Sequence, residues 1–277
     1  MPNRNIWILI ALLAAPAFTR AQWLNHPTPG IPRTPDGKPN LSAPTPRAAD
    51  GKPDFSGLWQ TEAAPPKDMS RLLPTGNGTG EDPPSQYFLN ILSDFKSEAE
   101  LLQPAAAALF RQREGNFAKE SPLSRCLPTG VPLAETAPAP YKIVQTSGMT
   151  VMLYERDTTY RQVYMDGRKL PDDPQPTWLG YSVGKWDGDT LVVDTLGFND
   201  RSWLDARGHT HSEALHLTER FHRLGFGHME VHVTIDDPKT YTRPFTLTLK
   251  QRLLPDSDLL ESFCAENEKD LTHFQGK

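Results

Sequence analysis

Residues 213–235 read EALHLTERFHRLGFGHMEVHVTI, and apolar and polar side chains alternate along most of this stretch. Such alternation is typical of β-strands that bury one face. The triplet Gly225-Phe226-Gly227 interrupts the pattern as a short loop would, which predicts a hairpin between strands at 213–224 and 228–235. A one-residue slip would move the apolar face to solvent, so the pattern also predicts the register. The expected apolar pairs are Phe221 with Val231 and Leu217 with Ile235.

A second hairpin is predicted by the Asp187-Gly188 pair, which separates β runs at 178–186 and 190–198. Asp-Gly between two such runs is the signal for a two-residue type I′ loop. The expected register sets Tyr181 opposite Asp194 and Val183 opposite Val192. The remaining predicted strands are 142–146, 150–156, 159–165, 245–253 and 259–265. Roughly nine sequential strands predict a mainly β fold, an antiparallel up-and-down (lipocalin-like) barrel or a strongly curled sheet.

One helical segment is expected before the strands, near residues 97–114. Acidic Glu98 and Glu100 stand at its start and Arg111 and Arg113 near its end, which suits the helix dipole. Pro104 lies inside the segment and is expected to kink it or split it in two.

The N-terminus has the pattern of a secretory signal peptide over residues 1–21. Arg4 precedes an apolar run at 6–18, and the small residue Ala21 stands before a plausible cleavage point at Gln22. The run is shorter than the about 20 apolar residues that span a bilayer. An uncleaved anchor is the alternative, and no later stretch is apolar enough to span. We therefore expect a secreted or periplasmic protein without a transmembrane segment once the signal is removed.

Eight of the 27 prolines fall between residues 22 and 56, where apolar periodicity is almost absent. This composition predicts an extended, polyproline-like tether followed by a single β-barrel domain at 57–277. The tether repeats one motif: DGKPNLS at 36–42 returns as DGKPDFS at 50–56. Two copies are too few for a solenoid.

Only two cysteines are present, Cys126 and Cys264. In an exported chain an even pair predicts one disulfide, and two unpaired buried thiols are the alternative. The net charge of −5 argues against a nucleic-acid partner, which requires a basic face. The chain has no P-loop and no Cys/His zinc pattern, so no cofactor is expected and the partner is expected to be a small molecule, as ligand or substrate.

Several stretches resemble an uncharacterised family of secreted proteins frequent in soil bacteria. They are PDFSGLW, KIVQTSGMTVMLYE, WLGYSVGKWDGDTLVVDTLGFNDRSWLD, HSEALHLTERF and IDDPKTYTRPF. The resemblance covers most of the chain after the signal peptide, but it implies no activity and no site residues. Its expected architecture is similar to lipocalin-like barrels in outline, and such an outline does not specify function.

Glu219 is the first candidate catalytic residue. By alternation it shares the apolar face with Leu217 and Phe221. A carboxyl group there must be paired with a cation or held protonated, and protonated carboxyl groups serve as general acids. The alternative is a structural ion pair with an inward arginine, Arg156 or Arg161.

His209, His211 and Glu213 are the other catalytic candidates, as base or ligands. In an extended segment the three side chains project to one side, as a metal site would need. The pattern is similar to a cupin metal motif, but the glutamate comes too early and a second histidine motif is missing. We therefore expect no metal, and solvated loop histidines are the alternative.

Candidate ligand-binding residues surround a long connection that begins at Asn199. Long loops at a barrel mouth often bind ligands. Trp203, Trp178 and Tyr181 could form an aromatic platform for a sugar ring or a planar ligand, with Asp194 and Asn199 beside it. Aromatic residues that plug the core are the alternative.

These features favour a secreted lyase or hydrolase that acts on a small, sugar-like or plant-derived molecule by carboxylate and histidine acid–base chemistry. The alternative is a non-catalytic small-ligand-binding protein of the cell envelope, and a structural envelope protein is a third reading. A cavity with converging polar groups would favour the first two, and a packed barrel the third.

Overall fold

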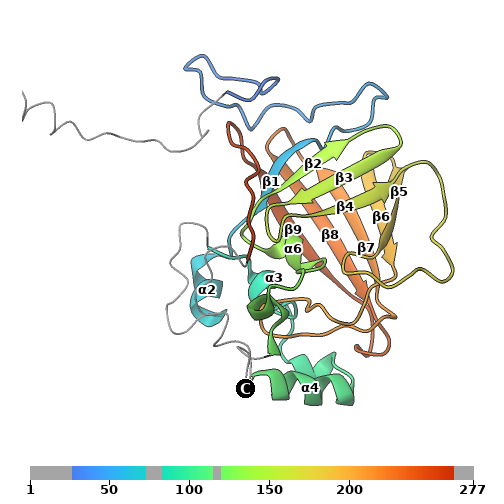
Figure 1. The fold of residues 1–277 in the computed structure, drawn as a ribbon. Helices are drawn as coiled ribbons and strands as arrows, with labels where there is room; N and C mark the ends of the chain where they lie inside the picture. Colours follow the sequence, from blue (N-terminus) through green and yellow to red (C-terminus); the bar gives the residue numbers. More distant parts are fainter. Residues whose placement is uncertain (1–26, 73–82, 115–119, 265–277) are drawn as a thin grey trace, which may run out of the picture.

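The structure is a computed structural model and describes residues 27–72, 83–114 and 120–264. Its strands form a closed barrel (Figure 1). The strands are β1 Gly57–Thr61, β2 Tyr141–Gln145, β3 Met149–Tyr154, β4 Thr159–Tyr164, β5 Tyr181–Asp187, β6 Thr190–Leu196, β7 His216–Arg223, β8 His228–Asp236 and β9 Phe245–Leu253. The predicted signal peptide at 1–21 lies outside the described residues.

Each strand pairs with the next one along the chain, and β9 pairs back onto β1. The predicted mainly β fold with a closed barrel of sequential strands is therefore confirmed. One seam differs from the expected antiparallel order, because β4 and β5 run parallel and pair at only two positions. Parallel neighbours need a crossover connection in place of a tight hairpin. Residues 165–180 supply that connection, which returns along the barrel before β5 begins.

The two predicted hairpins have different outcomes. In β7–β8 the register is the predicted one, with Phe221 opposite Val231. In β5–β6 it differs by two residues, since Tyr181 pairs with Leu196 and Asp187 with Thr190. The loop is therefore Gly188-Asp189, and Gly188 takes the positive φ of 61° that its first position needs. Inward and outward faces are unchanged, because the shift is even.

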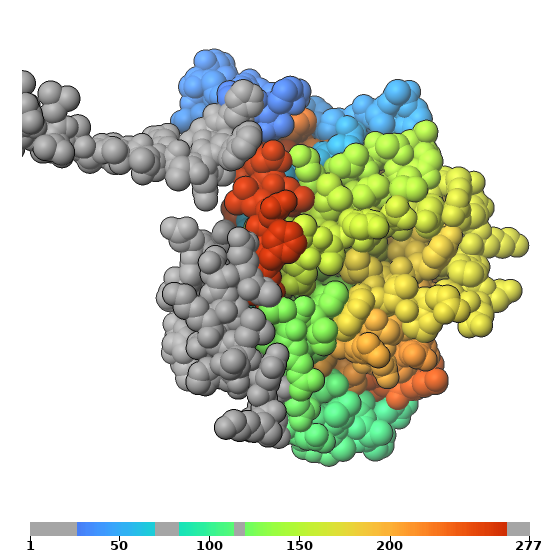
Figure 2. All heavy atoms as spheres, in the orientation of Figure 1, coloured from blue at the N-terminus to red at the C-terminus, as the bar shows by residue number. Residues whose placement is uncertain are grey.

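The first and last strands of the barrel also differ from the prediction. Residues 259–264, expected as the last strand, contain only an isolated bridge from Ser262 to Arg156. The short strand β1 closes the barrel in their place. The C-terminal segment, red in Figure 2, runs over the outer surface. There Cys264 forms the predicted disulfide with Cys126, with Cα atoms 5.4 Å apart.

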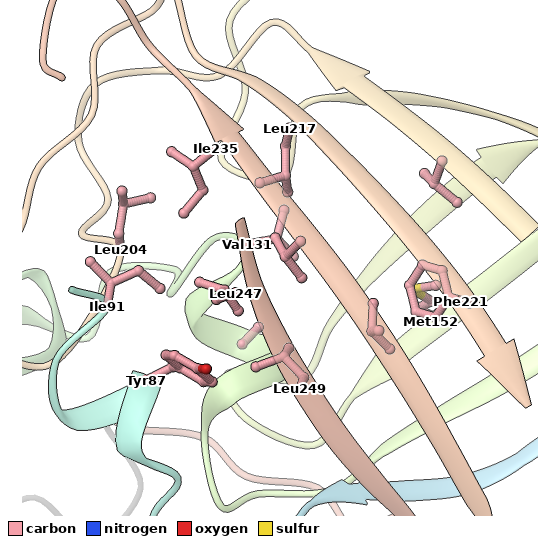
Figure 3. Packing of buried hydrophobic residues seen from close by; sticks show 14 of the residues in the cluster. Tyr87, Ile91, Val131, Met152, Leu204, Leu217, Phe221, Ile235, Leu247 and Leu249 are labelled. Carbon is pink, nitrogen blue, oxygen red and sulfur yellow. The ribbon is translucent and has the colours of Figure 1, made fainter. Parts of the chain in front are cut away.

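Apolar side chains fill much of the barrel and continue past one of its ends. Figure 3 shows Phe221, Leu217 and Ile235 inside the barrel, with Ile91 and Leu204 beyond it. Short helices cover this end: α2 Pro66–Leu72, α3 Gln86–Leu89, α4 Pro104–Glu114, α6 Leu133–Thr136, and the 3₁₀ turns Glu98–Glu100 and Pro122–Arg125. α4 begins at Pro104, where the missing N–H costs nothing.

The segment expected as an extended tether, residues 22–56, packs on the other end of the barrel over its described part, 27–56 (Figure 1). Backbone N–H groups of Phe226 and Gly227 donate to the carbonyls of Ala43 and Leu41. Phe55 is fully buried and its ring stacks on Trp186 at 5.8 Å. The proline content does not predict this packing. A proline-rich segment can still pack on the barrel when an apolar residue such as Phe55 is buried there.

The repeated motif forms the same turn twice. In each copy an arginine Nη1 donates to the motif's glycine carbonyl at 3.1 Å, Arg33 to Gly37 and Arg47 to Gly51. The same guanidinium groups also bind carboxylates elsewhere in the chain. Arg33 pairs with Asp256 and Arg47 with Asp189 in the β5–β6 loop. The two turns thus attach the segment at separate points.

Candidate functional site

A group of buried charges lies inside the barrel. Glu219 on β7 has the inward position expected for it, and the Arg161 guanidinium on β4 pairs with its Oε2. Arg161 Nη1 also donates to Oε1 of Glu135 in α6 at 3.0 Å. At most 2% of any of these three residues is exposed. The predicted alternative of an inward arginine partner for Glu219 is therefore what the geometry contains. We call these three residues the ion cluster.

Hydroxyl groups form further hydrogen bonds with the ion cluster. Arg161 Nε donates to Ser182 Oγ at 2.9 Å, and Nη2 donates to Thr195 Oγ1 at 2.7 Å. The Tyr154 hydroxyl donates to Glu135 Oε1 at 2.7 Å. Burial, and then the charge of Glu135, raise the pKa of Tyr154 well above its ordinary value. The tyrosine is therefore a fixed donor.

Two carboxyl groups share one guanidinium, so full ionisation would leave a net negative charge in the interior. Burial, and then repulsion from Glu219, raise the pKa of Glu135 well above its ordinary value. Among the described residues, Glu135 Oε2 and Glu219 Oε1 have no donor. A proton held on Glu135 makes the ion cluster neutral and lowers the cost of burying it.

Glu135→Gln is expected to change how stability depends on pH. The folded protein holds a proton on Glu135 that the unfolded chain, with a glutamate pKa of about 4.3, has released. The wild-type free energy of unfolding therefore falls as pH rises above that value, by at most about 1.4 kcal/mol per pH unit. The amide releases no proton, so its free energy of unfolding should not fall in this way. Between pH 5 and 8 the stability of the variant should therefore rise relative to that of the wild type, as measured in urea titrations. If the free energies of unfolding of the wild type and Glu135→Gln have the same pH dependence, the prediction is wrong. Glu213→Gln, at an exposed position, is the control and should follow the wild type.

A pocket of about 450 Å³ lies at the parallel seam between β4 and β5. The two strands pair only through Val163–Ser182 and Tyr164–Val183. On the N-terminal side of these pairs no backbone ladder joins them, and the pocket lies there. Four aromatic residues line it, and Arg161 and Ser182 of the barrel interior also border it. The aromatic residues are Tyr160, Tyr164, Trp178 and Tyr181. The pocket therefore adjoins the ion cluster.

Two of the five expected ligand-binding residues, Trp178 and Tyr181, line this pocket, and the other three lie elsewhere. Asp194 faces outward and accepts from Thr218 Oγ1 at 2.8 Å. Asn199 Oδ1 accepts from the Arg201 N–H. Trp203 is buried, with a guanidinium carbon 5.0 Å from its ring centre. The aromatic platform predicted for these residues does not form, because the loop after Asn199 packs against the end of the barrel.

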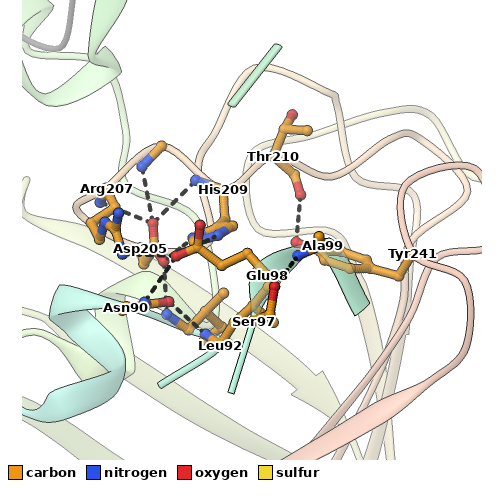
Figure 4. Close-up of polar contacts among 12 residues, drawn as sticks. Asn90, Leu92, Ser97, Glu98, Ala99, Asp205, Arg207, His209, Thr210 and Tyr241 are labelled. Atoms are coloured by element: carbon orange, nitrogen blue, oxygen red, sulfur yellow. Dashed lines mark hydrogen bonds and ion pairs between the residues drawn. The ribbon is translucent and has the colours of Figure 1, made fainter. Parts of the chain in front are cut away.

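His209 is buried in that loop. Its ring stacks on Phe110 of α4 at 4.2 Å, and its Nδ1 lies 2.5 Å from Asp205 Oδ2 (Figure 4). Asp205 also accepts backbone N–H groups, including that of Ile91 at 2.7 Å. Burial opposes its ionisation, but His209 and these donors hold the pKa of Asp205 below its ordinary value. The pair joins the loop to the helices beside it.

His211 and Glu213 point elsewhere. His211 Nε2 lies 2.8 Å from Ser202 Oγ, and its Nδ1 lies 3.1 Å from the Ser212 carbonyl. Burial lowers the pKa of His211, so the ring is neutral at neutral pH. Glu213 is exposed. The expected one-sided projection needs an extended strand, and β7 begins only at His216. Within the described ranges, no three His, Cys, Asp or Glu residues gather as metal ligands.

Sequence reasoning missed Glu135 and the pocket. Glu135 belongs to a four-residue helix among prolines, where no periodicity marks an inward position. Arg161 could be found, since it alternates with buried Val163 along β4 and has the charge that an inward glutamate needs. Tyr160 shows no pattern that distinguishes it from any outward strand residue.

Comparisons with protein-family models, with curated proteins and with solved structures find no match. Membership of the secreted soil-bacterial family that the sequence resembles therefore stays a prediction. None of the helices in the described part of the chain is both long and apolar enough to cross a membrane.

Proposed function

We propose that the protein binds a small molecule in the pocket between β4 and β5, and that it does so outside the cytoplasm. The observation that carries this proposal is the two-pair seam, which leaves an aromatic-lined cavity in an otherwise closed wall. Cavities of a few hundred Å³ lined by aromatic side chains and a few polar groups are typical ligand sites. The signal-peptide pattern and the Cys126–Cys264 disulfide support the location.

Binding without catalysis is favoured because the expected catalytic groups do not converge. Glu219 is held by Arg161, His209 by Asp205 and His211 by Ser202, in separate surroundings. A ligand-holding barrel needs none of them at its site. Its requirements are a shaped pocket and anchoring groups, which the seam supplies.

Acid–base catalysis at the same pocket is the second candidate function. One observation favours it: the ion cluster, in which Glu135 holds a proton, borders the pocket through Arg161, whose Nε donates to the pocket residue Ser182. Carboxyl groups with raised pKa values act as general acids. Product formation from a bound ligand, lost in Glu135→Gln while binding persists, would separate an enzyme from a binder.

Filling the pocket should abolish binding. Thr177 is exposed and lines the pocket, so Thr177→Trp places a large ring there without disturbing the core. In a thermal-shift screen of small molecules, a ligand at 100 times its Kd stabilises the wild type by about 2.7 kcal/mol. The variant should lose that shift. Thr246→Trp, at an exposed position on β9, is the matched control and should keep it. A ligand that shifts all three proteins equally binds elsewhere, and a screen in which every stabilising ligand does so refutes the proposal.

A further inference from the structure

We infer that the ligand of the β4–β5 pocket is a neutral saccharide of one or two rings, held between Tyr160 and Trp178. The inference rests on the proposed function and specifies its ligand class. It comes from three properties of the pocket lining. Within the described residues, two aromatic rings are not covered by another ring or a cation, several polar groups have no hydrogen-bond partner, and the charged residue in the lining is already paired.

Tyr160 and Trp178 both line the pocket and come from the two chain segments that form the seam. Tyr160 belongs to β4 and is 62% exposed, and Trp178 lies three residues before β5. Within the described part of the chain, neither ring stacks on another ring or carries a cation. Tyr164 differs, because it stacks on Tyr181 at 5.2 Å and has the Arg168 guanidinium 3.9 Å from its centre. Two rings with uncovered faces can pack against the C–H faces of a sugar ring, because aromatic faces are electron-rich and apolar.

Uncharged hydrogen-bonding groups border the same space. Thr159 and Thr177 line the pocket, and within the described ranges their hydroxyl groups form no hydrogen bond. Gln162 accepts from the Tyr164 hydroxyl through Oε1, which leaves its amide N–H groups to point at a ligand. A polyhydroxylated ring satisfies several such groups at once. A planar hydrocarbon would leave them without partners, which costs binding free energy.

The electrostatics of the lining favour a neutral molecule. Among the residues that the structure describes, Arg161 is the only charged one in the pocket lining, and its guanidinium already pairs with Glu135 and Glu219. A charged ligand would lose its hydration without gaining a counter-ion. The volume of about 450 Å³ is near the lower end for ligand pockets, which favours one or two sugar rings over a long chain.

The test is isothermal titration with four sets of probes: glucose, galactose and xylose; their β-1,4-linked disaccharides; glucuronic acid and glucosamine; and phenol and methyl 4-hydroxybenzoate. We expect at least one neutral sugar to bind and both charged sugars to bind at least tenfold more weakly. Tyr160→Ala and Trp178→Ala should each weaken binding at least tenfold. Val144→Ala removes an exposed side chain that does not line the pocket, and should bind as the wild type does.

The outcomes separate the inference from the proposed function. If only the phenolic probes bind, and Thr177→Trp abolishes their binding, the ligand is not a saccharide. The proposal that the pocket binds a small molecule then still holds. Sugar binding that survives both aromatic substitutions overturns the placement between Tyr160 and Trp178. Failure of every neutral sugar overturns the inference. The proposed function falls only if the thermal-shift screen also finds no ligand sensitive to Thr177→Trp.

Discussion

Replacing Arg161 with methionine is expected to lower the free energy of unfolding by about 3–5 kcal/mol at neutral pH, because it leaves buried carboxyl groups without a cation. Methionine keeps the approximate length of the side chain, so the loss is electrostatic more than steric. Without arginine, a buried carboxyl group of the ion cluster must stay ionised alone or take up a proton. That uptake costs more the further the pH lies above the unfolded value of about 4.3. The deficit should therefore be smaller at pH 4 than at pH 7 in chemical denaturation.

Two further variants separate charge from packing. Glu219→Gln should cost less than Arg161→Met, since Glu135 still lies 3.0 Å from the guanidinium and can ionise to pair with it. The double variant Arg161→Met/Glu219→Leu should recover much of the loss, because apolar replacements of a buried pair are often neutral. A pH-independent deficit below about 1 kcal/mol in Arg161→Met, the range of an exposed pair, would contradict the assignment of the ion cluster as a structural element.

Replacing Phe55 with alanine is expected to cost about 3–5 kcal/mol, as removal of a fully buried aromatic side chain does. The ring stacks on Trp186 and meets the edge of Phe221, so the substitution leaves a cavity at the end of the barrel. Equilibrium urea unfolding measures the loss. An extended tether would predict almost no effect, and a loss below about 0.5 kcal/mol, typical of surface sites, would refute the packing described above.

The repeat supplies a matched control for this prediction. Leu41 occupies the position in the first copy that Phe55 occupies in the second, but it is only partly buried. Leu41→Ala should therefore cost clearly less than Phe55→Ala. Equal losses would mean that both copies contribute alike, which the difference in burial contradicts.

Local patterns predicted much of the barrel. The β7–β8 register follows from alternation and one short loop, and the same alternation places Glu219 inside. The charge expected for a partner of Glu219 also left Arg161 as one of two candidate arginines, but the choice between them and the presence of Glu135 depend on elements far away in the chain. Nothing within a strand's own sequence states which strand will lie across the barrel from it. The disulfide was predictable, since only two cysteines exist.

The pocket could not be predicted for the same reason. It depends on how far β4 and β5 overlap, and that overlap is decided by a connection at 165–180 without periodicity. The histidine cluster failed in a different way. Residues 209–213 form a loop, and side chains in a loop do not alternate as they do in a strand, so the expected one-sided projection does not occur.

The uneven ladder around the barrel has a dynamic consequence. β4 pairs with β3 at six positions and β5 with β6 at seven, but only two pairs join β4 to β5. A closed ring of strands separates first where the fewest backbone hydrogen bonds must break, and local openings cost less than global unfolding. Such an opening at this seam would widen the pocket and admit solvent toward Arg161. We therefore expect protons and small solutes to reach the interior of the barrel through the β4–β5 seam.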